Sequence, residues 1–256
     1  MKQITRNKMK PIIGIAILLA VWFAVTKLKV FNAYVLPSPE KVLDSFLKMI
    51  QSGEIFTDIA ISFTRVIKGF FIAFLLAFAI GTFRILVPNS EPYYERILEF
   101  FRNVPPLSMI PLLILWCGIG EATKTVIIVL ASFFPMYLSI VKGFTGCDKR
   151  LLEVGEAFSY TSLKKFTHIV LPAATPDILV GMRIGMGYSW RAIIGAEMVA
   201  ASTGLGHMIL FSQQMSRTDK VIVGIFVIGV VGSVTDRLFG SAVKKIFKRT
   251  GENGWN

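Results

Sequence analysis

Residues 126–141 read VIIVLASFFPMYLSIV, and residues 178–198 read ILVGMRIGMGYSWRAIIGAEM. Each run is apolar enough for a helix that crosses a bilayer, whose hydrocarbon core takes roughly 20 residues. Between them lies EVGEAFSYTSLKKFTHIVLP, residues 153–172, which is polar and patterned for helices. Apolar runs on both sides of a polar connection predict an all-α protein that crosses a membrane several times.

The composition of the whole chain supports this interpretation. Of 256 residues, 54% are hydrophobic and 17% are charged, whereas a soluble domain normally carries about 25% charged residues. A formal net charge of +12 would suggest nucleic acid in a soluble protein, but that function needs an exposed basic face on a soluble domain. In a membrane protein the same excess is typical of cytoplasmic loops.

Six apolar segments are predicted to span the membrane. Pro105, Pro106 and Pro111 lie at the start of the third segment and predict a broken or kinked entry. The absence of an A-x-A cleavage pattern favours a retained signal-anchor helix at the N-terminus. The six segments are 11–27, 63–87, 104–120, 124–141, 176–197 and 221–240.

The lysines and arginines predict the orientation of these spans. They concentrate in the N-terminus, the connection between the second and third spans, the connection between the fourth and fifth, and the C-terminal tail. With six spans these regions share one side, and together they hold 17 of the 28 basic residues. Because basic loops stay in the cytoplasm, both termini and the polar stretch are expected to be cytoplasmic, in a multi-pass protein of the bacterial inner membrane.

The connection between the first and second spans is expected outside the cytoplasm. Pro37 and Pro39 interrupt the chain there, and residues 40–50 then predict an amphipathic helix. Val42, Phe46 and Met49 recur on one face of it at helical spacing.

A first short amphipathic helix is predicted at residues 151–158. Leu151, Val154, Gly155 and Phe158 would share one face of it. The sequence SYTS then breaks the helix, because Ser and Thr compete for backbone hydrogen bonds.

A second short helix follows, and Ser162 is expected to cap it. Leu163, Phe166 and Val170 form its apolar stripe, and Pro172 is expected to end it. Either the membrane surface and neighbouring loops cover the two stripes, or a groove on a soluble partner does. Periodicity alone leaves both interpretations open.

The polar stretch resembles the coupling motif of binding-protein-dependent ABC importer permeases. That motif has a Glu with two small residues, then a Gly, and nine residues later Ile-x-Leu-Pro. The front half is degenerate here, because Val154 is not small and Ser159 stands where Gly is expected. The positions that correspond to the motif are Glu153, Gly155, Ser159, Ile169, Leu171 and Pro172.

The resemblance extends over roughly residues 34–240. In this range the order and spacing of the segments are similar to those of the nitrate/sulfonate/taurine subgroup. It implies a type I importer transmembrane fold with about six helices and a cytoplasmic two-helix coupling loop at 148–172. The implied domains are an N-terminal tail and first helix (1–33), an extracytoplasmic segment (34–59), the transmembrane domain (60–241) and a basic tail (242–256). The segments that carry the resemblance are LPSPEKVL, FTRVIKGF, RNVPPLSMIPLLILWCGIGE, FFPMYLSIVKG, LPAATPDILVGMRIGMGYSW and GAEMVAASTGLGHMI.

The family also implies partners. These are two cytoplasmic ATPase subunits, an extracytoplasmic binding protein and a second permease, either a copy of this chain or a similar one. No GxxxxGK[ST] occurs, so the chain is expected to bind no cofactor, and ATP and Mg²⁺ belong to the ATPase. Glu153 would be the polar anchor in the ATPase groove, with Leu151, Phe158, Leu163 and Phe166 as apolar anchors. The subgroup suggests a small solute such as a sulfonate, taurine or nitrate.

Charged residues in the fifth segment are candidates for the translocation path, together with Trp190. A charge within a span is costly and usually faces a polar pathway or a partner. Arg191 would draw an anionic solute through the pore, or it would pair with Glu197 on the same or a neighbouring subunit. Arg183 is expected to snorkel to the cytoplasmic end. The GxxxG at 181–185 predicts close helix packing.

Two other classes of protein remain as alternatives. A secondary transporter or channel that works alone would place carboxylates at mid-membrane, and none of the six spans has one at its centre. A membrane enzyme would need clustered His, Asp or Glu, but His168 and His207 are isolated. The sequence therefore predicts no catalytic and no metal-binding residues.

Overall fold

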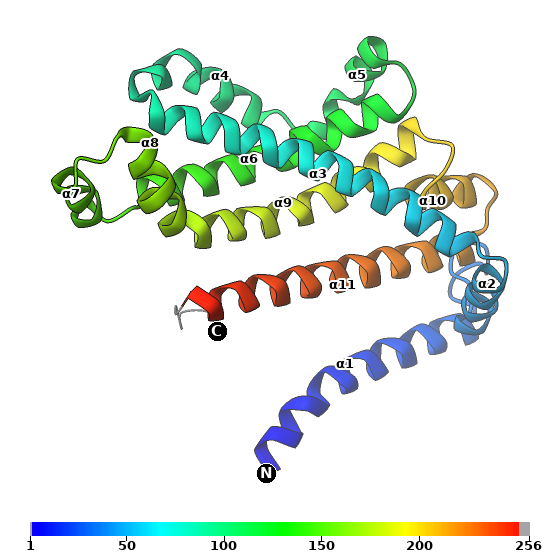
Figure 1. Cartoon of the computed structure of the whole chain (residues 1–256). Coiled ribbons are helices and arrows are strands. Elements are labelled where there is room, and N and C mark those ends of the chain that lie inside the picture. The colour runs from blue at the N-terminus through cyan, green and yellow to red at the C-terminus, as the bar shows by residue number, and fades with distance from the viewer. Residues whose placement is uncertain (1, 251–256) are drawn as a thin grey trace.

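The structure is a computed structural model that describes residues 2–250, with side chains at 13–87 and 89–244, and all its elements are helical (Figure 1). The part of the predicted tail at 242–256 that follows Lys244 lies outside the described side chains. The helices are α1 (Lys2–Lys27), α2 (Pro39–Gln51), α3 (Glu54–Leu86), η1 (Pro88–Ser90), α4 (Glu91–Asn103), η2 (Pro106–Met109), α5 (Ile110–Cys117), α6 (Glu121–Thr145), α7 (Lys149–Ala157), α8 (Ser162–Lys165), η3 (Phe166–Val170), α9 (Leu171–Ala200), α10 (Leu205–Gln214) and α11 (Thr218–Thr250).

Four helical stretches are long and apolar enough to cross a membrane. They are α3, α6, the continuous stretch Ser162–Ala200 that includes α9, and α11 as far as Lys244. The predicted span at 104–120 does not form a full-length helix by itself, because η2–α5 covers only Pro106–Cys117 and meets α4 at a bend of 91° where Pro105 and Pro106 interrupt the helix. The predicted break is therefore confirmed, and the bent pair forms either one broken span or a re-entrant loop. In α1 the described apolar part is Ile13–Lys27.

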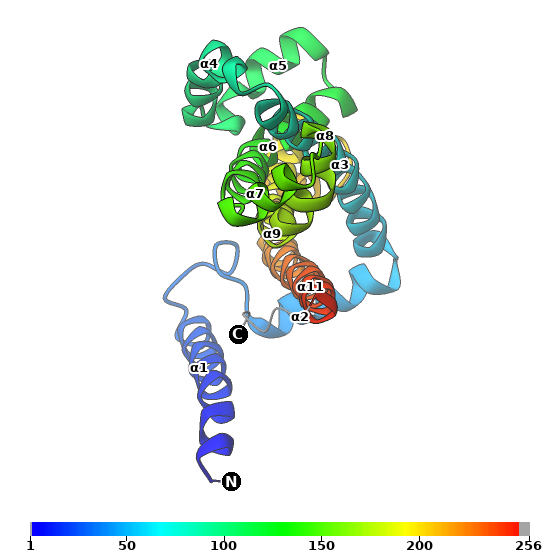
Figure 2. The ribbon, with the colours of Figure 1, turned by 60° about the vertical axis from the view of Figure 1, so that its left-hand side comes forward.

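The core is formed by α6 and α9, which lie side by side along most of their length, with α3 against α6 (Figures 1 and 2). Glycines allow this close approach. A Cβ on Gly181 would lie 2.6 Å from Ser139 Cβ, and one on Gly185 would lie 2.6 Å from Met136 Cγ. The predicted GxxxG packing is therefore confirmed, and its contact is with α6 of the same chain.

The helix bundle has two distinct ends. We call the end that carries α7 and α8 the loop end, and the end that carries α2 and α10 the opposite end (Figure 1). The N-terminus of α1, the last turn of α3 and the last turn of α11 also lie toward the loop end. The basic regions that the sequence assigns to one side therefore share one end. Which side of the membrane that end faces remains a prediction.

Helix α2 confirms the predicted amphipathic helix. Ser38 caps it by accepting a hydrogen bond from the backbone N–H of Lys41. Met49 is buried, and Val42 and Phe46 pack against the core. Ser45 on the same helix donates a hydrogen bond to Asp219 at the start of α11, so α2 is fixed across the opposite end.

Helix α1 stands apart from the other helices (Figure 2). Its apolar side chains are largely exposed, including Ile17 and Leu18. Its indole at Trp22 donates a hydrogen bond to the carbonyl of Pro37 at 3.1 Å. In a bilayer these exposed side chains are suited to lipid or to another subunit.

A charge cluster fastens four helices at the opposite end. The guanidinium of Arg65 on α3 donates to Glu121 on α6 and to Glu197 on α9, each at 2.7 Å, and to the carbonyl of Thr203 at 2.8 Å. Glu197 is fully buried. It also accepts hydrogen bonds from the hydroxyl of Ser62 at 2.8 Å and from the N–H of Gly206, on α10, at 3.0 Å.

Replacing Arg65 with Met is expected to destabilise the fold strongly. Glu197 would keep its buried position without its charge partner, a loss worth about 3–5 kcal/mol in other proteins. The measurement is the free energy of unfolding of the purified chain in detergent. Lys48→Met is the matched control, since Lys48 and Asp44 form an exposed pair of the kind worth about 1 kcal/mol or less. Equal losses in both variants would contradict the assignment.

Replacing Gly206 with Ala is expected to lower the free energy of unfolding by about 1–3 kcal/mol, because the added methyl would overpack the site. Its Cβ would collide with the backbone carbonyl of Ile194 and lie 2.8 Å from Glu197 Cβ. Gly187→Ala is the control, because nothing lies within 4 Å of the position of its Cβ. A Gly206→Ala variant as stable as the control would show that α10 is not packed on α9 in this way.

Candidate functional site

The loop end exposes a group of apolar side chains on two short helices. Leu151, Val154, Phe158 and Leu163 are all exposed, Phe158 by 70% and Leu163 by 62%. Glu153 is exposed beside them. We call these five residues the α7–α8 surface. Nothing else in the described part of the chain covers them, so they are available to a partner.

Residues beneath this surface hold the two helices in place. Gly155 is buried, and a Cβ there would lie 2.7 Å from Ile169 Cδ1. The ring of Phe166 is buried against Phe144, at the end of α6, with ring centres 5.2 Å apart. The expected role of Phe166 as an exposed anchor is therefore wrong. Ile169 and Leu171 are half-buried next to it and belong to the same support.

Ser159 occupies a backbone conformation that suits glycine. Its φ angle is +54°, in the left-handed region that costs an ordinary residue about 1–2 kcal/mol. This is the position at which the sequence motif expects a glycine. The turn between α7 and α8 therefore has the geometry that the resemblance implies, although Ser159 is not the residue that fits it best.

Two expected boundaries of the second helix are wrong. The cap is Thr161, whose hydroxyl accepts a hydrogen bond from the N–H of Lys164, and Ser162 is the first helical residue. Pro172 does not end the helix, because it lies in the first turn of α9, where a missing N–H is tolerated. A π-helical turn at Phe166–Val170 joins α8 to α9.

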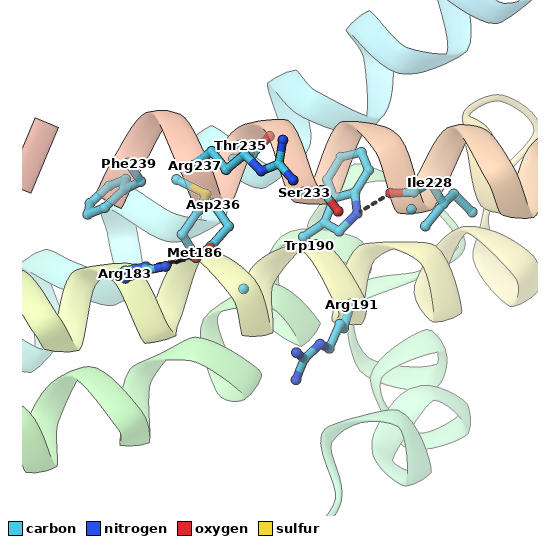
Figure 3. A pocket seen from close by; sticks show the side chains of 13 residues that line it. Arg183, Met186, Trp190, Arg191, Ile228, Ser233, Thr235, Asp236, Arg237 and Phe239 are labelled. Atoms are coloured by element: carbon cyan, nitrogen blue, oxygen red, sulfur yellow. Dashed lines mark hydrogen bonds and ion pairs between the residues drawn. The ribbon is translucent and has the colours of Figure 1, made fainter. Parts of the chain in front are cut away.

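Arg183 and Trp190 on α9 both face α11 (Figure 3). Arg183 donates to both carboxylate oxygens of Asp236, at 2.8 and 2.7 Å. The expectation that it snorkels to the helix end is wrong, since this partner satisfies it. Trp190 is buried and donates to the carbonyl of Ile228 at 3.2 Å. These side chains border a cavity of about 450 Å³ between α9 and α11, which we call the α9–α11 cavity.

Arg191 lies at the edge of the α9–α11 cavity, and its guanidinium projects away from α11 (Figure 3). Its guanidinium lies 5.8 Å from the ring centre of Tyr188. The pairing with Glu197 considered from the sequence is wrong within this chain, because Glu197 is fully buried and bound to Arg65. The structure thus separates these two residues, and only Arg191 remains on an accessible surface.

A second cavity, of about 510 Å³, lies beside Arg191 between α6 and α9, and we call it the α6–α9 cavity. Arg102 at the end of α4 and Leu107 of η2 close one side of it, so the bend between α4 and the η2–α5 pair shapes the cavity. Pro135 and Leu138 of α6 lie in its wall.

Sequence reasoning missed Arg65, Asp236 and Arg102 as members of these sites. A charge within a predicted span indicates that it has a partner. Arg65 in FTRVIKGF is therefore a candidate partner for Glu197, and Asp236 is one for Arg183. Arg102 carried no such signal, because it lies in a connection. Among the described residues, no group of three or more His, Cys, Asp or Glu is placed to hold a metal ion.

Comparisons with known proteins agree with this architecture. Residues 90–248 match the family model described as binding-protein-dependent transport system inner membrane component. A permease protein of Bacillus subtilis named for aliphatic sulfonate transport is 35% identical over 240 residues, which cover 94% of this chain and 87% of the relative. The taurine transport system permease protein of Escherichia coli is 32% identical, covering 85% of this chain and 81% of the relative.

Two further matches extend the set. A nitrate import permease protein of Synechocystis is 29% identical, covering 89% of this chain and 85% of the relative. One chain of a solved structure of the inward-facing MetNI methionine ABC transporter has the same fold, with a TM-score of 0.58 and 16% sequence identity. The match covers 73% of this chain and 94% of that chain. The chain therefore belongs to the family of binding-protein-dependent transport system inner membrane components, as a permease subunit of an ABC importer.

Proposed function

We propose that this permease imports a small organic anion or zwitterion, driven by a separate ATPase that grips the α7–α8 surface. The observation that carries the proposal is the exposure of Leu151, Phe158 and Leu163 on short helices whose undersides are locked to the core. An amphipathic surface of this kind suits a groove on a soluble partner. ATP and Mg²⁺ would be bound and used by that partner.

The contacts beneath the α7–α8 surface suggest how a movement of the ATPase is transmitted to the membrane-spanning helices. The segment from α7 to η3 connects α6 to α9 directly in the chain, and Phe166 packs on the last turn of α6. A movement of the partner would therefore carry α6 and α9 as a lever. Because packed helices shift as bodies between discrete arrangements, such a movement can close one end of a pathway and open the other.

The charge distribution supports a cytoplasmic loop end. Lys149, Arg150, Lys164 and Lys165 lie in the α7–α8 segment, and cytoplasmic loops carry such excess basic charge. In this orientation both termini are cytoplasmic. The opposite end, with α2, α10 and the loop at 201–204, would face the extracytoplasmic binding protein that delivers the solute.

The names of the relatives support a substrate class for this chain. Their names refer to aliphatic sulfonates, taurine and nitrate. Each of these small solutes has a negatively charged group of oxygen atoms around one central atom. We infer the same class for this chain. The exposed apolar faces of α1 and of α9 support a second permease in the complex, and a homodimer is the simplest arrangement. A pair with a different permease is the alternative arrangement.

Replacing Phe158 with Ala should weaken assembly with the ATPase about 30-fold, since truncation of a central aromatic anchor costs about 2 kcal/mol or more. Glu153→Ala should act in the same direction. The measurement is co-purification of the ATPase, together with ATP-dependent uptake of taurine or an alkanesulfonate into proteoliposomes that contain the binding protein.

The matched control is Phe211→Ala, another exposed phenylalanine, which lies on α10 at the opposite end. Its co-purification with the ATPase should equal that of the unaltered chain. Assembly and uptake that survive both substitutions at the loop end would count against the proposed surface. Uptake by the purified chain without any ATPase would instead favour a transporter that works alone.

A further inference from the structure

The α6–α9 cavity lies midway along the membrane-spanning bundle. Ala131 and Phe134 in its wall are close to the middle residue of α6, which runs from Glu121 to Thr145. The cavity lies beside the middle of α6, away from both ends of that helix, which is a placement suited to a solute in transit.

The polar side chains in the cavity wall carry positive charge or can donate hydrogen bonds. They are Arg102, Tyr188 and Arg191, and every other residue of the wall is apolar. Arg191 forms no ion pair with any carboxylate at the side chains the structure describes. Arg102 has one contact with Glu99, at 3.5 Å, the longest of the ion pairs described.

Among the described carboxylates, only Glu99 is paired with a charged residue of this wall, Arg102. Glu95 and Glu99 line a smaller, adjoining cavity that shares Arg102 with the α6–α9 cavity. Arg84 is itself paired with Glu91. Asp236, which lines the α9–α11 cavity, is held by Arg183. Two guanidinium groups therefore line one cavity: Arg191 has no carboxylate partner among the described residues, and Arg102 has only the partly exposed pair with Glu99.

A cationic site of this depth is unfavourable without a counter-ion. A charge in a span costs at least a few kcal/mol unless it faces water, a pathway or a partner. Arginine presents a planar fork that matches the oxygens of carboxylates, phosphates and other oxyanions. The apolar remainder of the wall, which includes Leu107 and Phe134, suits a short hydrocarbon body.

We propose that the α6–α9 cavity is a transit subsite that binds a compact organic oxyanion, with Arg191 and Arg102 on the charged group and the apolar wall around its body. This inference rests on the proposed import function, and it places part of the selectivity within the permease. The volume of about 510 Å³ lies within the range of about 300–1,000 Å³ that is usual for small-molecule sites.

The test is direct binding to the full-length chain in nanodiscs of phosphatidylcholine, with hexanesulfonate as the anionic probe and hexyl methyl sulfone as its uncharged counterpart. Arg191→Gln should weaken hexanesulfonate binding by at least about tenfold, as expected for the loss of a charged hydrogen bond. Arg102→Gln should weaken it in the same direction. Arg191→Lys, which keeps the charge, should retain part of the affinity.

The matched control is Arg96→Gln, an exposed arginine on the same helix as Arg102 that does not line the cavity. Its affinity should equal that of the unaltered chain. Equal affinity in Arg191→Gln and Arg102→Gln, or equal binding of the uncharged sulfone, would overturn the proposal. All variants should keep the unfolding midpoint of the unaltered chain. If Arg191→Gln lowers that midpoint, Arg191→Lys replaces it in the comparison of affinities.

A second arm separates the solute from lipid as the source of the oxyanion. Phosphatidylglycerol is added to the nanodiscs and the hexanesulfonate titration is repeated. Unchanged affinity supports a site for solutes, whereas an affinity that falls only while Arg191 is present would assign the cavity to an anionic lipid and overturn the transit role. This binding is measured without the ATPase. A failure of the cavity to bind hexanesulfonate therefore does not test docking at the α7–α8 surface, and a failure of docking does not change the binding result.

Discussion

Close packing of α6 against α9 is the constraint on which the remaining structure depends. Gly181 and Gly185 let the two helices approach so closely that a Cβ at either position would lie within 3.0 Å of Ser139 or Met136 and would force a shift. Since the chain leaves α6, forms α7 and α8, and returns in α9, this contact also fixes where the polar connection emerges. The same pair of helices borders the α6–α9 cavity. One packing contact therefore positions both the proposed grip for the ATPase and the proposed path for the solute.

The two ends of this helix pair are stabilised by different interactions. At the loop end the contact is apolar, with Phe166 on Phe144 and Gly155 beneath Ile169. At the opposite end it is ionic, with Arg65 between Glu121 and Glu197. A buried charge cluster has a strict geometry, because each group must keep its partners. We infer that this cluster holds the loop at 201–204 in register with α3 and α9.

Much of this fold follows from local sequence signals. Apolar runs predict the long helices, the prolines at 105–106 predict the break, and the apolar periodicity after Pro37 and Pro39 predicts α2. Details that depend on distant partners did not follow. The partner of Glu197 is Arg65, 132 positions away, and no local pattern encodes that pair. The apolar stripe alone does not tell which of its members face a partner, and Phe166 is buried against Phe144 at the end of α6, a contact that no local pattern predicts.

The central claim is that the segment from α7 to η3 carries α6 and α9 as a lever, which requires α8 to stay rigidly joined to α9. Pulsed electron paramagnetic resonance can measure the distance between spin labels at Thr167, which is exposed next to α8, and at Ile184 on α9. The labels are placed in the assembled transporter after Cys117 and Cys147 are replaced. The account predicts the same distance distribution with and without ATP, while a pair that joins Thr167 sites in the two permeases changes. A shift in the Thr167–Ile184 distance on ATP binding would show that the π-helical turn is a hinge, and it would contradict the account.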